Sequence, residues 1–180
     1  VAFLNEFGLI EKPLQNYFWS GIITLLIIYL FIWEPAIIYA KGQRILELIF
    51  NFFKPLVRVA PYLLPIYTVI LFIIYTLLSL VVSAKGGKSD WLIRYSLFLF
   101  GFTIALHLIF SSKTIRSKKS DFLKGNYIFG FSFIYIINLI LLALLINLIF
   151  KEFSFVNFFN NSFQIAKSIL YAVFKQLFLR

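Results

Sequence analysis

The feature that most constrains the fold is the segment from Tyr127 to Phe150, in which no residue carries a charge. A helix of this length rises about 36 Å, enough to cross a hydrocarbon core of roughly 30 Å. Apolar residues make up 62% of the chain and charged residues 13%. A soluble fold of 180 residues has too little interior to bury so much apolar surface. The sequence therefore predicts an all-α, polytopic integral membrane protein.

Three further segments are long and apolar enough to cross the membrane. Pro65 lies in the first turns of one of them and predicts a kink or a late helix start there. The short, glycine-rich turn 85–90 joins two antiparallel neighbours. We predict one membrane domain, residues 1–180, whose four transmembrane helices cover about 18–39, 59–84, 91–111 and 127–150.

Two segments outside these spans have the pattern of amphipathic helices. Residues 41–57 place basic side chains among apolar ones at a spacing close to i, i+3, i+4, i+7. A helix lying in the membrane interface fits this pattern, and an ordinary connecting loop is the alternative. Residues 163–178 carry Gln164, Lys167, Ser168 and Lys175 on one side. We expect this helix to lie in the interface or to dock on a partner, rather than to form a fifth span.

The distribution of basic residues predicts the orientation of the chain. The net charge is +10, and the Lys and Arg residues sit mainly between the apolar segments. Basic residues in such places face anionic lipid headgroups, so we expect the bilayer and no nucleic acid as a partner. The positive-inside rule places 41–58 and 113–124 in the cytoplasm and both termini outside. The bacterial plasma (inner) membrane is the expected location, and an organellar membrane is the alternative.

Glu34 and His107 are the first candidates for a functional role at membrane depth. Glu34 is the one acidic residue that can lie inside a span, where ionisable groups are costly. Either Glu34 and Pro35 end the first span and begin the next helix, or the carboxyl group is buried and pairs with His107 or a partner chain. His107 is the single histidine, and it is expected at a depth similar to that of Glu34. It serves either as a hydrogen-bonded packing residue or in proton handling.

Three other polar residues in the spans are candidate interaction residues. Arg94, one turn into the third span, is expected to snorkel to the outer headgroups, and anchoring an anionic ligand is the alternative. Asn138 and Asn147 lie 2.5 helical turns apart and therefore point to opposite sides of the fourth span. Each amide needs a partner, so this helix is expected to have neighbours on both sides, one of which can be another polypeptide. Alternatively, Asn147 reaches the interface near Lys151.

The sequence lacks the residue patterns of catalysis and of metal binding. It contains no Cys, no HExxH, no GxSxG, no P-loop and no clustered metal ligands, so we predict no catalytic residue, no metal site and no cofactor. Our first hypothesis is a noncatalytic subunit or scaffold of a larger membrane protein complex. A small oligomeric transporter or channel that uses Glu34 and His107 is the second. A lipid-interacting, membrane-shaping protein is the third.

Overall fold

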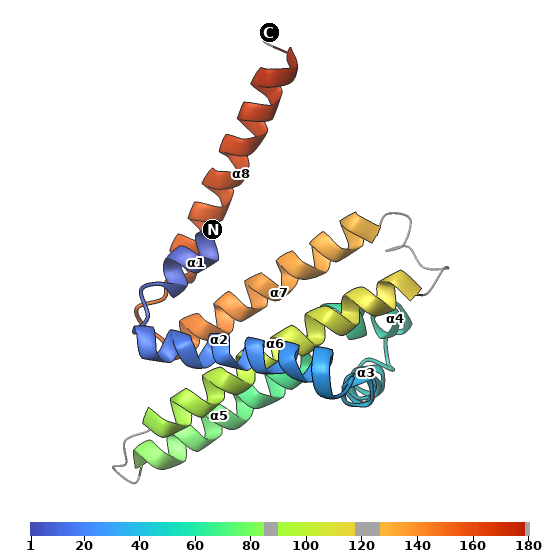
Figure 1. Cartoon of the computed structure of the whole chain (residues 1–180), viewed down its shortest axis with the longest axis vertical. Coiled ribbons are helices and arrows are strands. Elements are labelled where there is room, and N and C mark those ends of the chain that lie inside the picture. The colour runs from blue at the N-terminus through green and yellow to red at the C-terminus, as the bar shows by residue number, and fades with distance from the viewer. Residues whose placement is uncertain (85–89, 118–126, 179–180) are drawn as a thin grey trace. The chain divides into compact units, whose positions relative to one another are not determined.

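The computed structural model describes residues 1–84, 90–117 and 127–178, and every regular element within these ranges is a helix. The chain divides into two compact units (Figure 1). The central unit is Pro13–Asn138, and the terminal unit combines Val1–Lys12 with Leu139–Arg180, so that one boundary falls inside helix α7 (Tyr127–Ile149). The predicted all-α class is confirmed.

Four helices of the described residues are long and apolar enough to cross a membrane, which confirms the predicted polytopic class. They are α2 (Lys12–Ile27) with its π-helical continuation η1 (Ile28–Ile32), α5 (Ile66–Ala84), α6 (Asp90–Ser117) and α7. Residues 85–89 of the predicted turn 85–90 and the basic residues at 118–124 lie outside the described residues, whereas Asp90 begins α6.

The first membrane-spanning helix begins and ends earlier than the predicted 18–39. It runs from Lys12 to Ile32, and its 21 residues rise about 31 Å, the thickness of a hydrocarbon core. Trp33 follows in an extended conformation, with φ −163° and ψ 145°. Pro35 disfavours helical geometry at the residue before it, which explains why the helix stops here. The next helix, α3 (Ala36–Ile49), starts directly after this proline.

The predicted helix 41–57 and the predicted span 59–84 are divided differently in the structure. The chain forms α3, then α4 (Lys54–Leu63), and then α5, with a break at Leu64 and Pro65. Helices α3 and α4 pack against each other as a hairpin. The C-terminal helix α8 (Phe155–Phe178) begins two turns before the predicted 163. The interfacial location of these helices stays a prediction.

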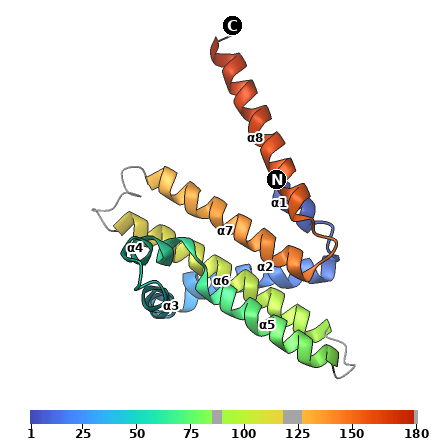
Figure 2. The same ribbon diagram turned by 180° about the vertical axis from the view of Figure 1, so that it is seen from behind.

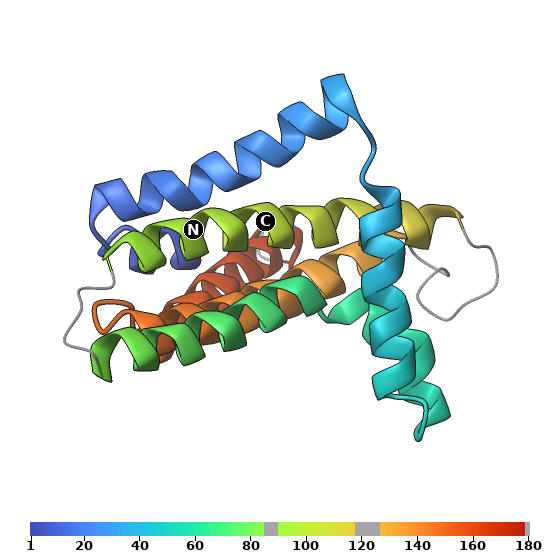
Figure 3. The same cartoon turned by 90° about the horizontal axis from the view of Figure 1, so that it is seen from below.

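In the central unit, α6 packs against α2, α3, α4 and α5 (Figure 3). The core cluster comprises Leu25, Tyr39, Ala105, Leu106 and Phe110. Helices α2 and α6 approach so closely that a Cβ atom on Gly21 would collide with the backbone of Phe98, and one on Gly101 with the backbone of Phe18. Small residues permit such backbone approach between membrane helices, where tight packing replaces the hydrophobic effect.

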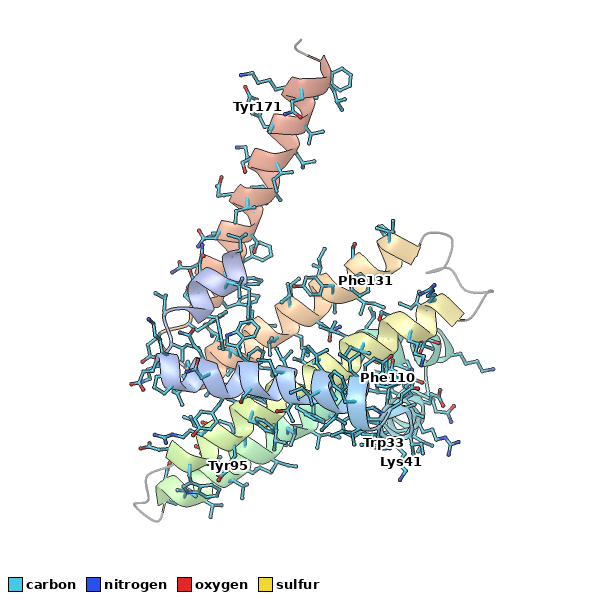
Figure 4. The ribbon with its side chains drawn as sticks, in the orientation of Figure 1. Trp33, Lys41, Tyr95, Phe110, Phe131 and Tyr171 are labelled. Carbon is cyan, nitrogen blue, oxygen red and sulfur yellow. The ribbon has the colours of Figure 1, made fainter. Side chains whose placement is uncertain are left out.

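In the terminal unit, helix α1 (Ala2–Phe7) packs against the beginning of α8. Aromatic side chains form the contact: the Phe3 ring lies 5.9 Å from Phe153 and 6.3 Å from Phe158, measured between centroids. Beyond this contact, every residue from Ala166 to Phe178 is exposed, and Tyr171 projects outward from the helix (Figure 4). Much of α8 therefore offers both its polar and its apolar side to the surroundings.

Candidate functional site

The break between α4 and α5 leaves backbone carbonyls without helical partners. Proline has no N–H, so Pro65 cannot donate to the carbonyl of the residue four positions before it. The next amide, that of Ile66, donates to Leu64 at 2.9 Å rather than to residue 62. The carbonyls of residues 61–63 therefore end α4 and need donors from elsewhere, because an unpaired buried carbonyl is costly.

Polar side chains from three other helices supply these donors, one to each carbonyl. Helices α3, α4 and α6 meet at this end of the central unit (Figure 2). The Tyr39 hydroxyl lies 3.4 Å from the Pro61 oxygen, His107 Nε2 lies 3.0 Å from the Tyr62 oxygen, and Asn138 Nδ2 lies 3.2 Å from the Leu63 oxygen. We call Tyr39, His107 and Asn138 the capping triad.

The hydrogen bonds around His107 indicate which ring nitrogen carries a proton. The Tyr62 carbonyl can only accept, so the proton lies on Nε2, which is also 3.2 Å from the Ser111 hydroxyl. Ser111 in turn lies 3.0 Å from the Tyr39 hydroxyl. Burial raises the pKa of the Tyr39 phenol above its ordinary value, so the group keeps its proton and can donate to Pro61. These side chains form one connected network around the break.

A second polar contact and a small cavity lie next to the capping triad. The hydroxyls of Thr68 and Thr103 are 2.9 Å apart and connect α5 to α6. The cavity, lined in part by Tyr39, Thr103 and His107, has a volume of about 10 Å³. That is roughly the space that one water molecule needs, and too little for a larger solute. The space beside the capping triad is therefore closely packed.

Glu34 and His107 have separate partners in the structure. Glu34 lies in the connection between the first span and α3, and its carboxylate pairs with the Lys113 ammonium, both side chains being about half exposed. His107, in contrast, is 5% exposed and bonds to Tyr62 and Ser111. The structure therefore supports Glu34 as the end of the first span and does not bring the two predicted residues into a common site.

Asn138 and Asn147 both find partners within the chain. Asn138 is buried and bridges to α4, whereas the Asn147 side chain accepts a hydrogen bond from the Phe155 amide at 2.9 Å, where α8 begins. The amide groups therefore do not require another polypeptide. The Asn138 Oδ1 atom is buried and, among the described residues, has no hydrogen-bond partner.

Arg94 lies at the exposed beginning of α6, as expected for a side chain that reaches the headgroups. Its guanidinium carbon is 6.0 Å from the centre of the Tyr17 ring on α2, within the range of a cation–π interaction. Two aromatic residues of α6, Trp91 and Tyr95, lie close to Arg94 in the sequence and are also exposed.

Four buried polar residues were not singled out from the sequence, namely Tyr39, Glu6, Thr68 and Ser111. Tyr39 belongs to the capping triad, and the spacing of Pro61 and Pro65 was a usable signal, because a proline four residues after a carbonyl removes its helical donor. Glu6 is buried in the terminal unit, where one oxygen accepts from the Asn161 amide at 3.3 Å and the other has no partner among the described residues. No sequence pattern indicated the burial of Glu6.

The candidate residues do not assemble a metal site: within the described ranges, no three His, Asp or Glu residues cluster to hold an ion. Comparison with known proteins finds no matching family model, no similar curated protein and no similar solved structure.

Proposed function

We propose that this chain is a noncatalytic subunit or scaffold of a larger membrane protein complex, located in the bacterial plasma (inner) membrane. The observation that carries the proposal is the use of the buried polar groups. The capping triad, Ser111 and the pair of Thr68 and Thr103 are all engaged in hydrogen bonds that hold helices together. Side chains committed in this way stabilise a framework and are not available to a substrate.

The exposed surface of the spans supports association with other membrane proteins. Only 11% of the most apolar window of α5 is buried within the chain, and 17% of the corresponding window in the first span. Lipid covers such faces in an isolated chain, and partner helices can cover them in a complex. The long exposed part of α8 adds a second surface, with apolar and polar sides, for the same purpose.

The test is the mass of the assembly extracted from native membranes. Extraction in a mild detergent followed by native mass measurement should give a species well above the 21.1 kDa of the chain, with other polypeptides in fixed ratio. A denaturing detergent should release the chain alone, which controls for adventitious aggregation. A monodisperse 21.1 kDa species from fresh native membranes contradicts the proposal.

The broken helix favours one rival, a small oligomeric transporter or channel. Transporters place unwound backbone next to their substrate sites, as α4 and α5 do beside His107. If this rival is right, Glu34→Gln or His107→Gln reduces a proton or solute flux in proteoliposomes. Equal flux in both variants and in the parent protein, each verified as monodisperse, rejects it and leaves the scaffold as the better explanation.

A further inference from the structure

Helices α2 and α6 begin at the same end of the central unit (Figure 3). A pocket lies between the residues at these two helix beginnings. Its volume is about 450 Å³, and it is lined by Tyr17, Asp90, Trp91, Arg94 and Tyr95. This volume is in the range of small-molecule sites, roughly 300–1,000 Å³. The close contact at Gly21 and Gly101 holds the two helices together further along, and Arg94 over the Tyr17 ring connects them beside the pocket.

The pocket combines two opposite charges with aromatic rings. Asp90 and Arg94 are four residues apart on one helix, which places them about one turn, or ~6 Å, apart along its axis. Among the described residues, they do not form an ion pair with each other. The Arg94 guanidinium instead lies over the Tyr17 ring. Its N–H groups point outward in the guanidinium plane, so this arrangement leaves them available to another acceptor.

The surroundings of the pocket indicate a ligand that comes from the membrane. Trp91 and Tyr95 are exposed, and Figure 4 shows Tyr95 projecting from the beginning of α6. Aromatic residues at the ends of spans lie at the level of the headgroups. On α6, the exposed Leu99 lies one turn after Tyr95, on the same side of the helix. A lipid headgroup in the pocket would therefore have apolar surface along which its acyl chains can lie.

We propose that this pocket binds the headgroup of a zwitterionic phospholipid, with the phosphate on Arg94 and the ammonium group on Asp90 and the neighbouring rings. Arginine forms forked, charge-assisted hydrogen bonds with phosphate. A carboxylate flanked by aromatic faces attracts an ammonium group. The two charges of a phosphoethanolamine headgroup are joined by a short ethylene linker, which suits charged side chains one helical turn apart. This binding role does not depend on whether the chain works as a subunit.

Native mass spectrometry of the purified full chain tests the proposal with lipids of matched acyl chains. Phosphatidylethanolamine should bind better than phosphatidylglycerol, which has the phosphate but no ammonium group. Arg94→Gln should weaken the binding of both lipids about tenfold, the effect of one charge-assisted hydrogen bond. Asp90→Asn should weaken phosphatidylethanolamine binding alone. Arg116→Gln, which removes an exposed cation at the other end of α6, is the matched control and should leave the preference unchanged.

Free phosphoethanolamine distinguishes a lipid site from a general phosphate site. It should not displace the lipid at equal concentration, because it lacks acyl chains. Displacement at equal concentration overturns the lipid assignment. Equal binding of the two lipids to the parent protein, or equal loss in Arg94→Gln and Arg116→Gln, overturns the proposal as well. Circular dichroism and gel filtration of each variant verify that the helices and the monodisperse state are retained.

Discussion

Asn138→Leu is the substitution that examines the capping triad most directly. The Asn138 side chain lies near the middle of the candidate span Ile128–Ile149 and is 1% exposed, so water cannot replace it as a donor. Leucine has nearly the same volume and is favoured in a membrane helix, so the change removes the amide with little effect on packing. It leaves the Leu63 carbonyl without the hydrogen bond that it receives from α7.

The expected cost follows from the contacts that are lost. A hydrogen bond between membrane helices contributes about 0.6 kcal/mol on average and up to ~1.7 kcal/mol. Leaving the Leu63 carbonyl unpaired adds a desolvation cost of roughly 1–3 kcal/mol. Removing the buried Asn138 Oδ1, which has no partner among the described residues, offsets part of that cost. We therefore expect Asn138→Leu to lower the free energy of unfolding by about 1–2 kcal/mol.

The assay is reversible unfolding in mixed detergent micelles, followed by circular dichroism. Asn147→Leu is the matched control, because it makes the same substitution in the same helix where the side chain accepts one exposed hydrogen bond. It should cost about 0.5 kcal/mol or less. If both variants unfold at the same detergent fraction as the parent protein, the carbonyl of Leu63 does not depend on Asn138 and the capping argument is refuted.

Three other substitutions examine separate features. Gly101→Ala should destabilise the chain by about 2 kcal/mol in the same assay, because the added Cβ meets a backbone oxygen of α2 that no rotamer change can move. An unchanged unfolding midpoint would contradict the close crossing of α2 and α6. Removing Glu34 or Lys113 should change stability little, since both side chains are about half exposed, and added salt should abolish any difference; a salt-independent loss would contradict this. The chain has no native Cys, so single introduced cysteines report exposure in proteoliposomes. If α8 lies in the interface, Val173→Cys on its apolar side should react with a membrane-impermeant maleimide much more slowly than Gln164→Cys on its polar side, and equal rates would contradict that location.

The fold class could be predicted because membrane-spanning helices require long apolar segments, and four such segments are visible in the sequence. The helix ends were less predictable. Residues 12–17 are polar enough to resemble a loop, yet the first span needs them to reach the thickness of the bilayer. The break at Pro65 was anticipated only as a kink or late start, because a proline alone does not reveal whether neighbouring helices can satisfy the freed carbonyls.

The candidate site was predictable in its residues and unpredictable in its contacts. His107 and Asn138 stand out as polar side chains within apolar segments, and both are buried. Their partners are backbone carbonyls 45 and 75 residues away in the sequence. Of the two alternatives for Glu34, the end of the first span agrees with its pairing to Lys113, whereas His107 bonds to a backbone carbonyl that its own sequence neighbourhood does not reveal. The actual pairing depends on the register of four helices, which composition and periodicity do not determine.

The helix break gives a physical reason why the helices of the central unit depend on one another. A continuous helix would satisfy its carbonyls within its own backbone and impose no requirement on its neighbours. The break transfers that requirement to α3, α6 and α7, each of which supplies one member of the capping triad. Displacing any one of them exposes a buried carbonyl, which packing of apolar side chains alone cannot compensate. Pro65, which separates α4 from α5, therefore increases the specificity with which the surrounding helices are placed.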